Sequence, residues 1–230
     1  MKFDKNIFEG EFICRPNRFN AKVLLNDEEL IVHVPNTGRC REILKEGTKV
    51  FLREELNPNR KTKYDLIAAM KGNIFINIDS QIPNKVVNEA LQNKKIENLR
   101  KYSKINREKT FGKSRFDFKL STETDEIYYL EVKGVTLEQD GHCRFPDAPT
   151  ERGTKHIMEL IEAKKQGYGA GILFLIQLDN VYTFSPNDET DIEFAKALRL
   201  AKENGVDIMA YSCIVGKKMI EINKEIDIIL

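Results

Sequence analysis

The stretch Ser114–Val135, SRFDFKLSTETDEIYYLEVKGV, decides how the second half of this chain folds. It holds two runs of alternating apolar and polar residues around a polar loop centred near Thr124, a pattern that predicts a two-stranded antiparallel ribbon. With the loop at that position, residues whose numbers add up to about 248 face each other, and Asp117 lies directly across from Glu131. Lys133 follows on the same face as Glu131, because side chains alternate between the two faces of a strand.

Two facing carboxylates repel each other, and a shared proton or a hard cation removes the repulsion. Mg²⁺, or Mn²⁺ in its place, prefers oxygen ligands, so Asp117 and Glu131 are candidate metal ligands and catalytic residues. A lysine beside them can stabilise a phosphate oxygen or activate a water, and the layout with Lys133 supports metal-assisted hydrolysis of phosphodiesters. Glu89, in a helical pattern upstream, is the candidate for one more catalytic carboxylate. The same residues also fit the polar side of an ordinary hairpin, since Glu-x-Lys triplets recur by chance in a chain rich in both.

Beyond the ribbon, helix and strand patterns alternate. The expected helices cover 150–167 and 189–205, and the expected strands cover 170–178, 206–215 and 218–230. Thr150 or Thr154 is the expected N-cap of the first of these helices, and Gly167 its end. Another helical stripe begins at Val86. Residues 83–230 therefore predict an α/β domain built on a mixed central sheet.

The first part of the chain has a different pattern, because short strands follow one another without an intervening helix. The expected strands cover 9–15, 21–26, 29–35, 48–55, 63–71 and 73–78. Residues 1–82 thus predict a small β-barrel of the OB type, a fold whose strands and loops often bind single-stranded nucleic acid. Arg15, Arg18 and Arg39 lie at or near its turns, where they are candidates for phosphate contacts; the alternative is that they are ordinary solvated arginines.

Charge is unevenly distributed along the chain, although the formal net charge is only +1. Residues 84–119 hold eleven Lys or Arg against four acids. Such a segment attracts polyanions, so it favours nucleic acid as a partner, while a solvated lysine-rich face is the alternative. Arg115 belongs to this segment and lies on the same face of the ribbon as Asp117.

The segment 141–156, which follows the ribbon, gathers charged residues at the start of a predicted helix. A helix N-terminus with nearby cations suits a phosphate group, which makes Arg152 and Lys155 candidate nucleic-acid contacts. A capped helix whose charges pair with each other fits equally well. His156 and His33 fit ordinary polar positions better than metal ligands.

Composition indicates a soluble globular protein, with 41% hydrophobic and 32% charged residues. No apolar run approaches the length of a bilayer span, and no secretory signal is recognisable, so we expect a cytoplasmic protein without membrane contact. The four cysteines lie far apart, which argues against a thiolate metal site and favours reduced thiols.

Six motifs, in this order and at these intervals, closely resemble the sugar fermentation stimulation protein A (SfsA) family: RPNRFNAKV, VPNTG, NKVVNEAL, SRFDF, YLEVKGVTL and FPDAPTERGTKHI. The resemblance spans nearly the whole chain. It implies an OB domain followed by a domain like the PD-(D/E)xK nucleases, in a DNA-binding protein linked to the regulation of maltose metabolism. By motif, Asp117, Glu131 and Lys133 take the metal and catalytic positions, and Glu89 that of the helical acid.

Three functions are compatible with these observations. The first is a nucleic-acid-binding protein with a Mg²⁺-dependent nuclease site, acting on single- or double-stranded DNA. The second is a DNA-binding regulator without catalysis, since many nuclease-like folds bind DNA and do not cut it. The third is an RNA-processing nuclease, because OB barrels accept RNA as readily as single-stranded DNA.

Overall fold

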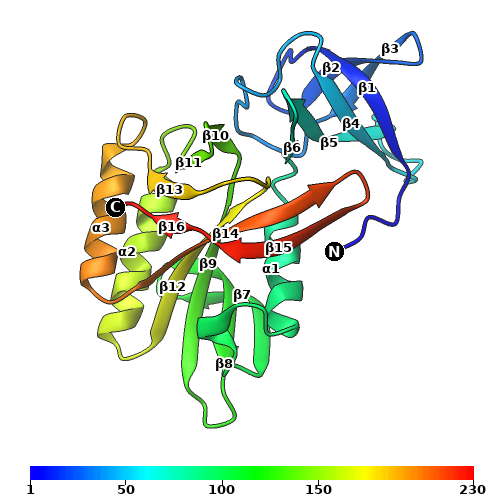
Figure 1. The fold of residues 1–230 in the computed structure, drawn as a ribbon. Helices are drawn as coiled ribbons and strands as arrows, with labels where there is room; N and C mark the ends of the chain where they lie inside the picture. Colours follow the sequence, from blue (N-terminus) through cyan, green and yellow to red (C-terminus); the bar gives the residue numbers. More distant parts are fainter.

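A six-stranded sheet closes into a barrel at the N-terminal end of the computed structural model, which describes residues 1–230 (Figure 1). Its strands are β1 (Ile7–Cys14), β2 (Asn20–Leu25), β3 (Glu28–His33), β4 (Lys49–Glu54), β5 (Tyr64–Lys71) and β6 (Ile74–Asn77), in the order β3-β2-β1-β4-β5-β6. His33 of β3 pairs with Asp65 of β5, and this bridge closes the barrel. Asn26 and Asp27 have positive φ angles, as a tight two-residue hairpin between β2 and β3 requires. The predicted OB-like barrel is confirmed.

The second domain is built on a mixed sheet in the order β15-β14-β12-β9-β8-β7. The strands are β7 (Lys104–Phe111), β8 (Ser114–Ser121), β9 (Ile127–Val135), β12 (Gly169–Ile176), β14 (Asp207–Gly216) and β15 (Met219–Glu225). Strand β12 pairs in parallel with both β9 and β14, and the outer pairings are antiparallel. Every residue from Ala170 to Ile176 is buried, as expected for a strand covered on both faces. The predicted mixed α/β domain is therefore confirmed.

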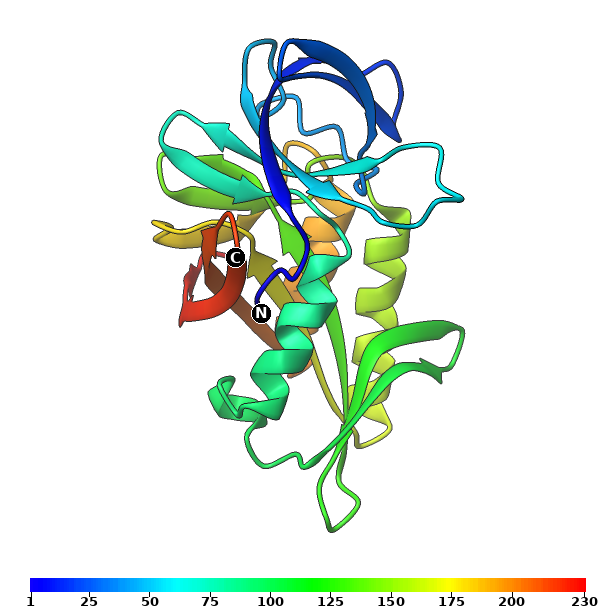
Figure 2. The same cartoon turned by 90° about the vertical axis from the view of Figure 1, so that its right-hand side faces the viewer.

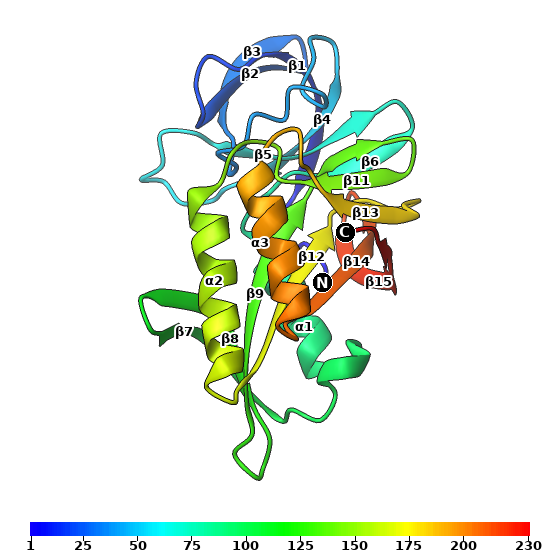
Figure 3. The ribbon, with the colours of Figure 1, turned by 90° about the vertical axis from the view of Figure 1, so that its left-hand side faces the viewer.

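Three helices cover this sheet. Helices α2 (Glu151–Lys165) and α3 (Ile192–Glu203) lie side by side on one face, and α1 (Ile82–Gln92) lies on the other (Figures 2 and 3). The Thr150 side chain accepts a hydrogen bond from the Gly153 N–H, which confirms it as the N-cap of α2. Two apolar clusters, one on each face, follow from this layering. None of the helices combines the length and the apolarity that crossing a membrane requires.

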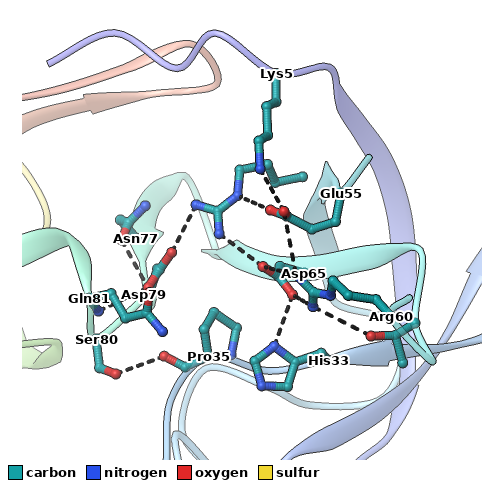
Figure 4. Close-up of polar contacts among 12 residues, drawn as sticks. Lys5, His33, Pro35, Glu55, Arg60, Asp65, Asn77, Asp79, Ser80 and Gln81 are labelled. Atoms are coloured by element: carbon teal, nitrogen blue, oxygen red, sulfur yellow. Dashed lines mark hydrogen bonds and ion pairs between the residues drawn. The ribbon is translucent and has the colours of Figure 1, made fainter. Parts of the chain in front are cut away.

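The two domains share both apolar and polar contacts. A small sheet of β10 (Leu137–Gln139), β11 (His142–Phe145), β13 (Thr183–Pro186) and β16 (Asp227–Ile228) completes the second domain, and Lys71 of β5 pairs there with Glu138 at 2.7 Å. Arg53 of β4 contacts Asp79, in the segment that joins β6 to α1, at 3.0 Å; Figure 4 shows Asp79 among the polar residues of this junction. The larger apolar cluster contains residues of both domains.

Four strands were not predicted from the sequence. Strand β7 has no buried residue because it is the outer strand of the sheet, and its charged side chains give no alternation to detect. Strands β10, β11 and β13 have only three or four residues each, too few for a periodic signal. The basic segment 84–119 thus consists of α1, a 3₁₀ turn at Glu97–Leu99 and the β7–β8 hairpin.

Candidate metal centre and nucleic-acid surface

Strands β8 and β9 place Asp117 beside Glu131. The paired residues run from Ser121 with Ile127 to Phe118 with Leu130, so the numbers of each pair add up to 248, as predicted. Asp117 is the next residue beyond the last pair. Its Oδ2 accepts a hydrogen bond from the Val132 N–H at 2.8 Å, so a side-chain carboxylate binds the backbone of β9 where the ladder ends.

Helix α1 contributes the second contact to Asp117. The Asn84 Nδ2 donates a hydrogen bond to Oδ1 of Asp117 at 2.7 Å. Asn84 lies in the first turn of α1, directly after Pro83, whose fixed φ angle suits the start of a helix. Both carboxylate oxygens of Asp117 are therefore held by donors from two different elements, which fixes the orientation of the group.

Glu131 is a carboxylic side chain that is nearly inaccessible to solvent, at 3% exposure. Its Oε1 accepts hydrogen bonds from Lys133 Nζ at 2.7 Å and from His156 Nδ1, on α2, at 2.5 Å. Its Oε2 is buried and has no hydrogen-bond partner. An unpartnered carboxylate oxygen in the interior costs free energy, unless a ligand or a cation occupies the position beside it.

The two carboxyl groups differ in acidity. Burial raises the pKa of Asp117, and the negative charge of Glu131 raises it further. Burial acts in the same direction on Glu131, but the hydrogen bond from His156 and the charge of Lys133 outweigh it, so the pKa of Glu131 is lowered. The surroundings thus favour the protonated form of Asp117 and the ionised form of Glu131.

These residues fit a divalent cation. Asp117 and Glu131 supply hard oxygen ligands, and the unpartnered Oε2 of Glu131 leaves one of them free to bind. The set is small, because no group of three or more His, Cys, Asp and Glu side chains could hold a metal ion. Water and substrate oxygens would have to complete the coordination, which is the usual arrangement for Mg²⁺.

Glu89 lies elsewhere. Its carboxylate accepts a hydrogen bond from the amino group of Met1 at 2.8 Å, and it has no contact with Asp117 or Glu131. The residue of α1 that reaches the site is Asn84. His156, which in sequence fits an ordinary polar position, lies against Glu131. The sequence gives little indication of either role, since neither an asparagine in a first helical turn, as Asn84 is, nor a lone histidine such as His156 is distinctive.

The barrel arginines divide into two kinds. Arg15 donates to the carbonyl oxygens of Gly38, Arg39, Arg18 and Asn36, so its guanidinium holds two loops together and has no donor directed at solvent. Arg18 and Arg39 are exposed and form no ion pair. They line, with Arg41, a groove of about 410 Å³ on the barrel surface. This groove thus brings together three exposed cations that form no ion pair.

The three remaining cations lie around the β7–β8 hairpin and the start of α2. Arg152 Nε lies 3.5 Å from Nε2 of His156, so it is one side chain removed from Glu131. The Lys155 Nζ donates to the carbonyl of Lys113 at 3.2 Å, and Arg115 pairs with Glu108 at 3.5 Å on the surface. Such exposed contacts contribute little to stability, so these side chains can leave them at low cost.

The fold and the site define a two-domain protein in which an OB-type barrel adjoins an α/β domain with a carboxylate pair and a lysine at the end of a strand ladder. Two family models match the chain: "SfsA N-terminal OB domain" over residues 13–78 and "Sugar fermentation stimulation protein RE domain" over residues 81–219. The chain therefore belongs to the SfsA family, which confirms the resemblance seen in its motifs.

Curated relatives are similar over their full length. The sugar fermentation stimulation protein homolog of Clostridium perfringens (strain SM101 / Type A) is 67% identical over 230 residues, which cover 100% of both chains. The homolog of Clostridium botulinum (strain Hall / ATCC 3502 / NCTC 13319 / Type A) is 65% identical over 228 residues, or 99% of each. Among solved structures, Pyrococcus furiosus SfsA in complex with Ca²⁺ matches with a TM-score of 0.90 at 27% identity, covering 100% of both chains.

Proposed function

We propose that this protein binds DNA and hydrolyses phosphodiesters with a divalent cation, Mg²⁺ or Mn²⁺, held by Asp117 and Glu131. The observation that carries the proposal is the buried, unpartnered Oε2 of Glu131 beside a second carboxylate whose pKa is raised. The SfsA structure from Pyrococcus furiosus, which is in complex with Ca²⁺, supports a divalent site in the family. DNA binding is also the activity through which a role in sugar (maltose) metabolism would act.

The residues around the carboxylates have separable tasks. When bound, a divalent cation supplies Lewis-acid stabilisation of negative charge on a phosphodiester. Lys133 spends one of its three N–H donors on Glu131, which leaves two for a phosphate oxygen or a water. His156 and Asn84 fix the orientations of Glu131 and Asp117. The exposed arginines of the barrel groove and the β7–β8 hairpin supply phosphate contacts that do not depend on base sequence.

A DNA-binding protein without catalysis is the second candidate function. It is favoured by one observation, the absence of a third carboxylate or histidine that could join Asp117 and Glu131 around a metal. In that case the carboxylate pair is a remnant of the fold, and the cationic surface carries the whole activity.

A cleavage assay with matched lysine variants separates the two functions. End-labelled single- and double-stranded DNA and RNA are incubated with Mg²⁺ or Mn²⁺ and the wild-type protein, Lys133→Met or Lys165→Met. Lys165 is exposed in the last turn of α2, away from the basic segment 84–119, and serves as the control. We expect product with wild type and Lys165→Met, a loss of about 10²-fold or more with Lys133→Met, and unchanged binding in all three. Binding without any metal-dependent product refutes the nuclease and leaves the second candidate. Preferential cleavage of RNA assigns the RNA-processing alternative.

A further inference from the structure

A polar cavity of about 210 Å³ lies where the barrel meets the second domain. One wall is the loop at 36–38, between β3 and β4. The other is formed by the end of β9, by the end of β11 with Asp147 just beyond it, and by Gln177 after β12. A space of this size can hold several water molecules or one small ring system. Its place between the domains makes it separate from the carboxylate pair.

The walls of this cavity are fixed. Arg15 binds the carbonyls of Asn36 and Gly38, which holds the barrel loop in place. A Cβ atom on Gly38 would lie 2.8 Å from Oδ2 of Asp147, and a Cβ atom on Gly134 would lie 3.1 Å from Nε2 of Gln177. Both glycines therefore permit a close approach of two walls that any side chain would disturb.

Three polar side chains line the cavity. Arg144 and Asp147 belong to none of the ion pairs of the chain. Gln177 is 2% exposed, and its Oε1 is shielded from solvent and has no hydrogen-bond partner. A cation and a carboxylate thus line one space together with an amide that has an unpartnered oxygen. The carboxylate disfavours a free phosphate, and the scarcity of apolar side chains disfavours a lipid-like ligand.

A nucleobase matches this mixture of groups. The edges of a base carry acceptors that suit a guanidinium and amino donors that suit a carboxylate or an amide oxygen. The cavity is also close to the proposed site, because Gly134, in its wall, directly follows Lys133 on β9. At the rise of a β-strand, Gly134 is about 10 Å from Glu131 along the chain.

We infer that this cavity receives one unstacked base of the bound strand and thereby positions the neighbouring phosphate at Asp117 and Glu131. The inference rests on the proposed binding of nucleic acid. Unstacking of a base costs least in a single strand, which the barrel groove is suited to hold. Gln177, Arg144 and Asp147 then read the edge of the base, and the strand enters the site in a fixed register.

An abasic scan tests the inference. Binding of a short single-stranded DNA is measured by fluorescence anisotropy, and each position in turn carries an abasic sugar. The wild-type protein is compared with Gln177→Leu and with the control Gln166→Leu, an exposed glutamine at the end of α2. Arg144→Met is a second cavity variant, in case Gln177→Leu does not fold.

With wild type and Gln166→Leu, we expect one abasic position to weaken binding about tenfold or more, the equivalent of one or two good hydrogen bonds. With Gln177→Leu or Arg144→Met, the same abasic position should change affinity less than about threefold, because residue and base act as a coupled pair. Normal strand binding with an abasic effect that these variants leave unchanged overturns the inference alone. Failure of the wild type to bind any strand overturns both the inference and the proposed function.

Discussion

Replacement of Arg53 by methionine should destabilise the protein more than the loss of any surface ion pair. The guanidinium is 14% exposed and contacts three carboxylates: Glu55 at 2.9 Å, Asp65 at 2.9 Å and Asp79 at 3.0 Å (Figure 4). Glu55 and Asp65 keep Arg60 as a partner when Arg53 is removed. Asp79, at 1% exposure, keeps only the backbone N–H of Gln81.

The loss of stability follows from the buried Asp79 carboxylate, which is left without a cationic partner. Removal of one partner of a buried ion pair typically costs about 3–5 kcal/mol, because the other charge stays buried and unpaired. In a chain of this length, each kcal/mol corresponds to about 2–4 °C in Tm, so we expect a decrease of roughly 6–20 °C by calorimetry or circular dichroism.

The destabilisation caused by Arg53→Met should depend on pH. Burial already raises the pKa of Asp79 above its ordinary value, and the loss of Arg53 removes a charge that lowers it. When the pKa of a group is higher in the folded state than in the unfolded state, the protein loses stability as the pH rises from the lower to the higher of these two pKa values. The destabilisation of Arg53→Met should therefore be smaller near pH 4 than at pH 8, and Arg53→Met/Asp79→Asn should recover part of it.

Lys49→Met is the matched control, because Lys49 lies on the same strand and its ion pair with Glu9 is exposed. Its loss should cost less than about 1 kcal/mol. If Arg53→Met costs no more than Lys49→Met, or if its effect does not depend on pH, the buried network does not stabilise the junction of the two domains.

Three further predictions concern single groups. Burial alone would raise the pKa of Asp65, but hydrogen bonds from Arg60, His33 and Arg53 lower it to about 2. The wild-type protein should therefore lose about 2 kcal/mol of stability as the pH falls from about 4 towards 2. Asp65→Asn should not show that loss in denaturant titrations. Asp117→Asn should raise Tm in metal-free buffer by about 2–4 °C, because it removes a buried charge beside Glu131. Asn84 can rotate its amide and accept a hydrogen bond from the new N–H group. An unchanged or lower Tm would contradict this interpretation. Arg39→Met should reduce the slope of log K against log salt for DNA binding by about 1. Arg15→Met should instead lower Tm, because Arg15 holds the barrel loops together. A lower Tm with Arg39→Met and a reduced salt slope with Arg15→Met would contradict these two roles.

The alternation in β8 and β9 was sufficient to predict the ribbon, its register and the meeting of Asp117 with Glu131, because register depends on local sequence once the loop is placed. The helical partner was not predictable in this way. Asn84 and Glu89 are five residues apart and therefore rotated by about 140° around α1, so only one of them faces β8. Which one does so depends on how the helix packs on the sheet, and that is a property of the tertiary structure.

The roles of His156 and Arg15 depend on tertiary structure in the same manner. His156 reaches Glu131 because α2 crosses the sheet above β9, a contact between residues 25 positions apart. Arg15 resembles any loop arginine until the carbonyl groups of two loops converge on it. Strand β7 shows the converse, since a charged outer strand has the composition of a solvated segment, and only its pairing with β8 defines it.

Calorimetric titration of Mn²⁺ and Mg²⁺, with a parallel thermal-shift measurement, tests the central claim most directly. Wild type, Asp117→Asn and the control Asp125→Asn are compared; Asp125 lies in the β8–β9 loop at φ 59°, a conformation that asparagine accepts. Binding should occur in wild type and Asp125→Asn, and it should weaken as the pH falls, because protons compete with the cation for Asp117, whose pKa is raised. It should be absent in Asp117→Asn. Equal metal binding by Asp117→Asn and wild type, or no binding by any of the three, would contradict a divalent cation site at Asp117 and Glu131.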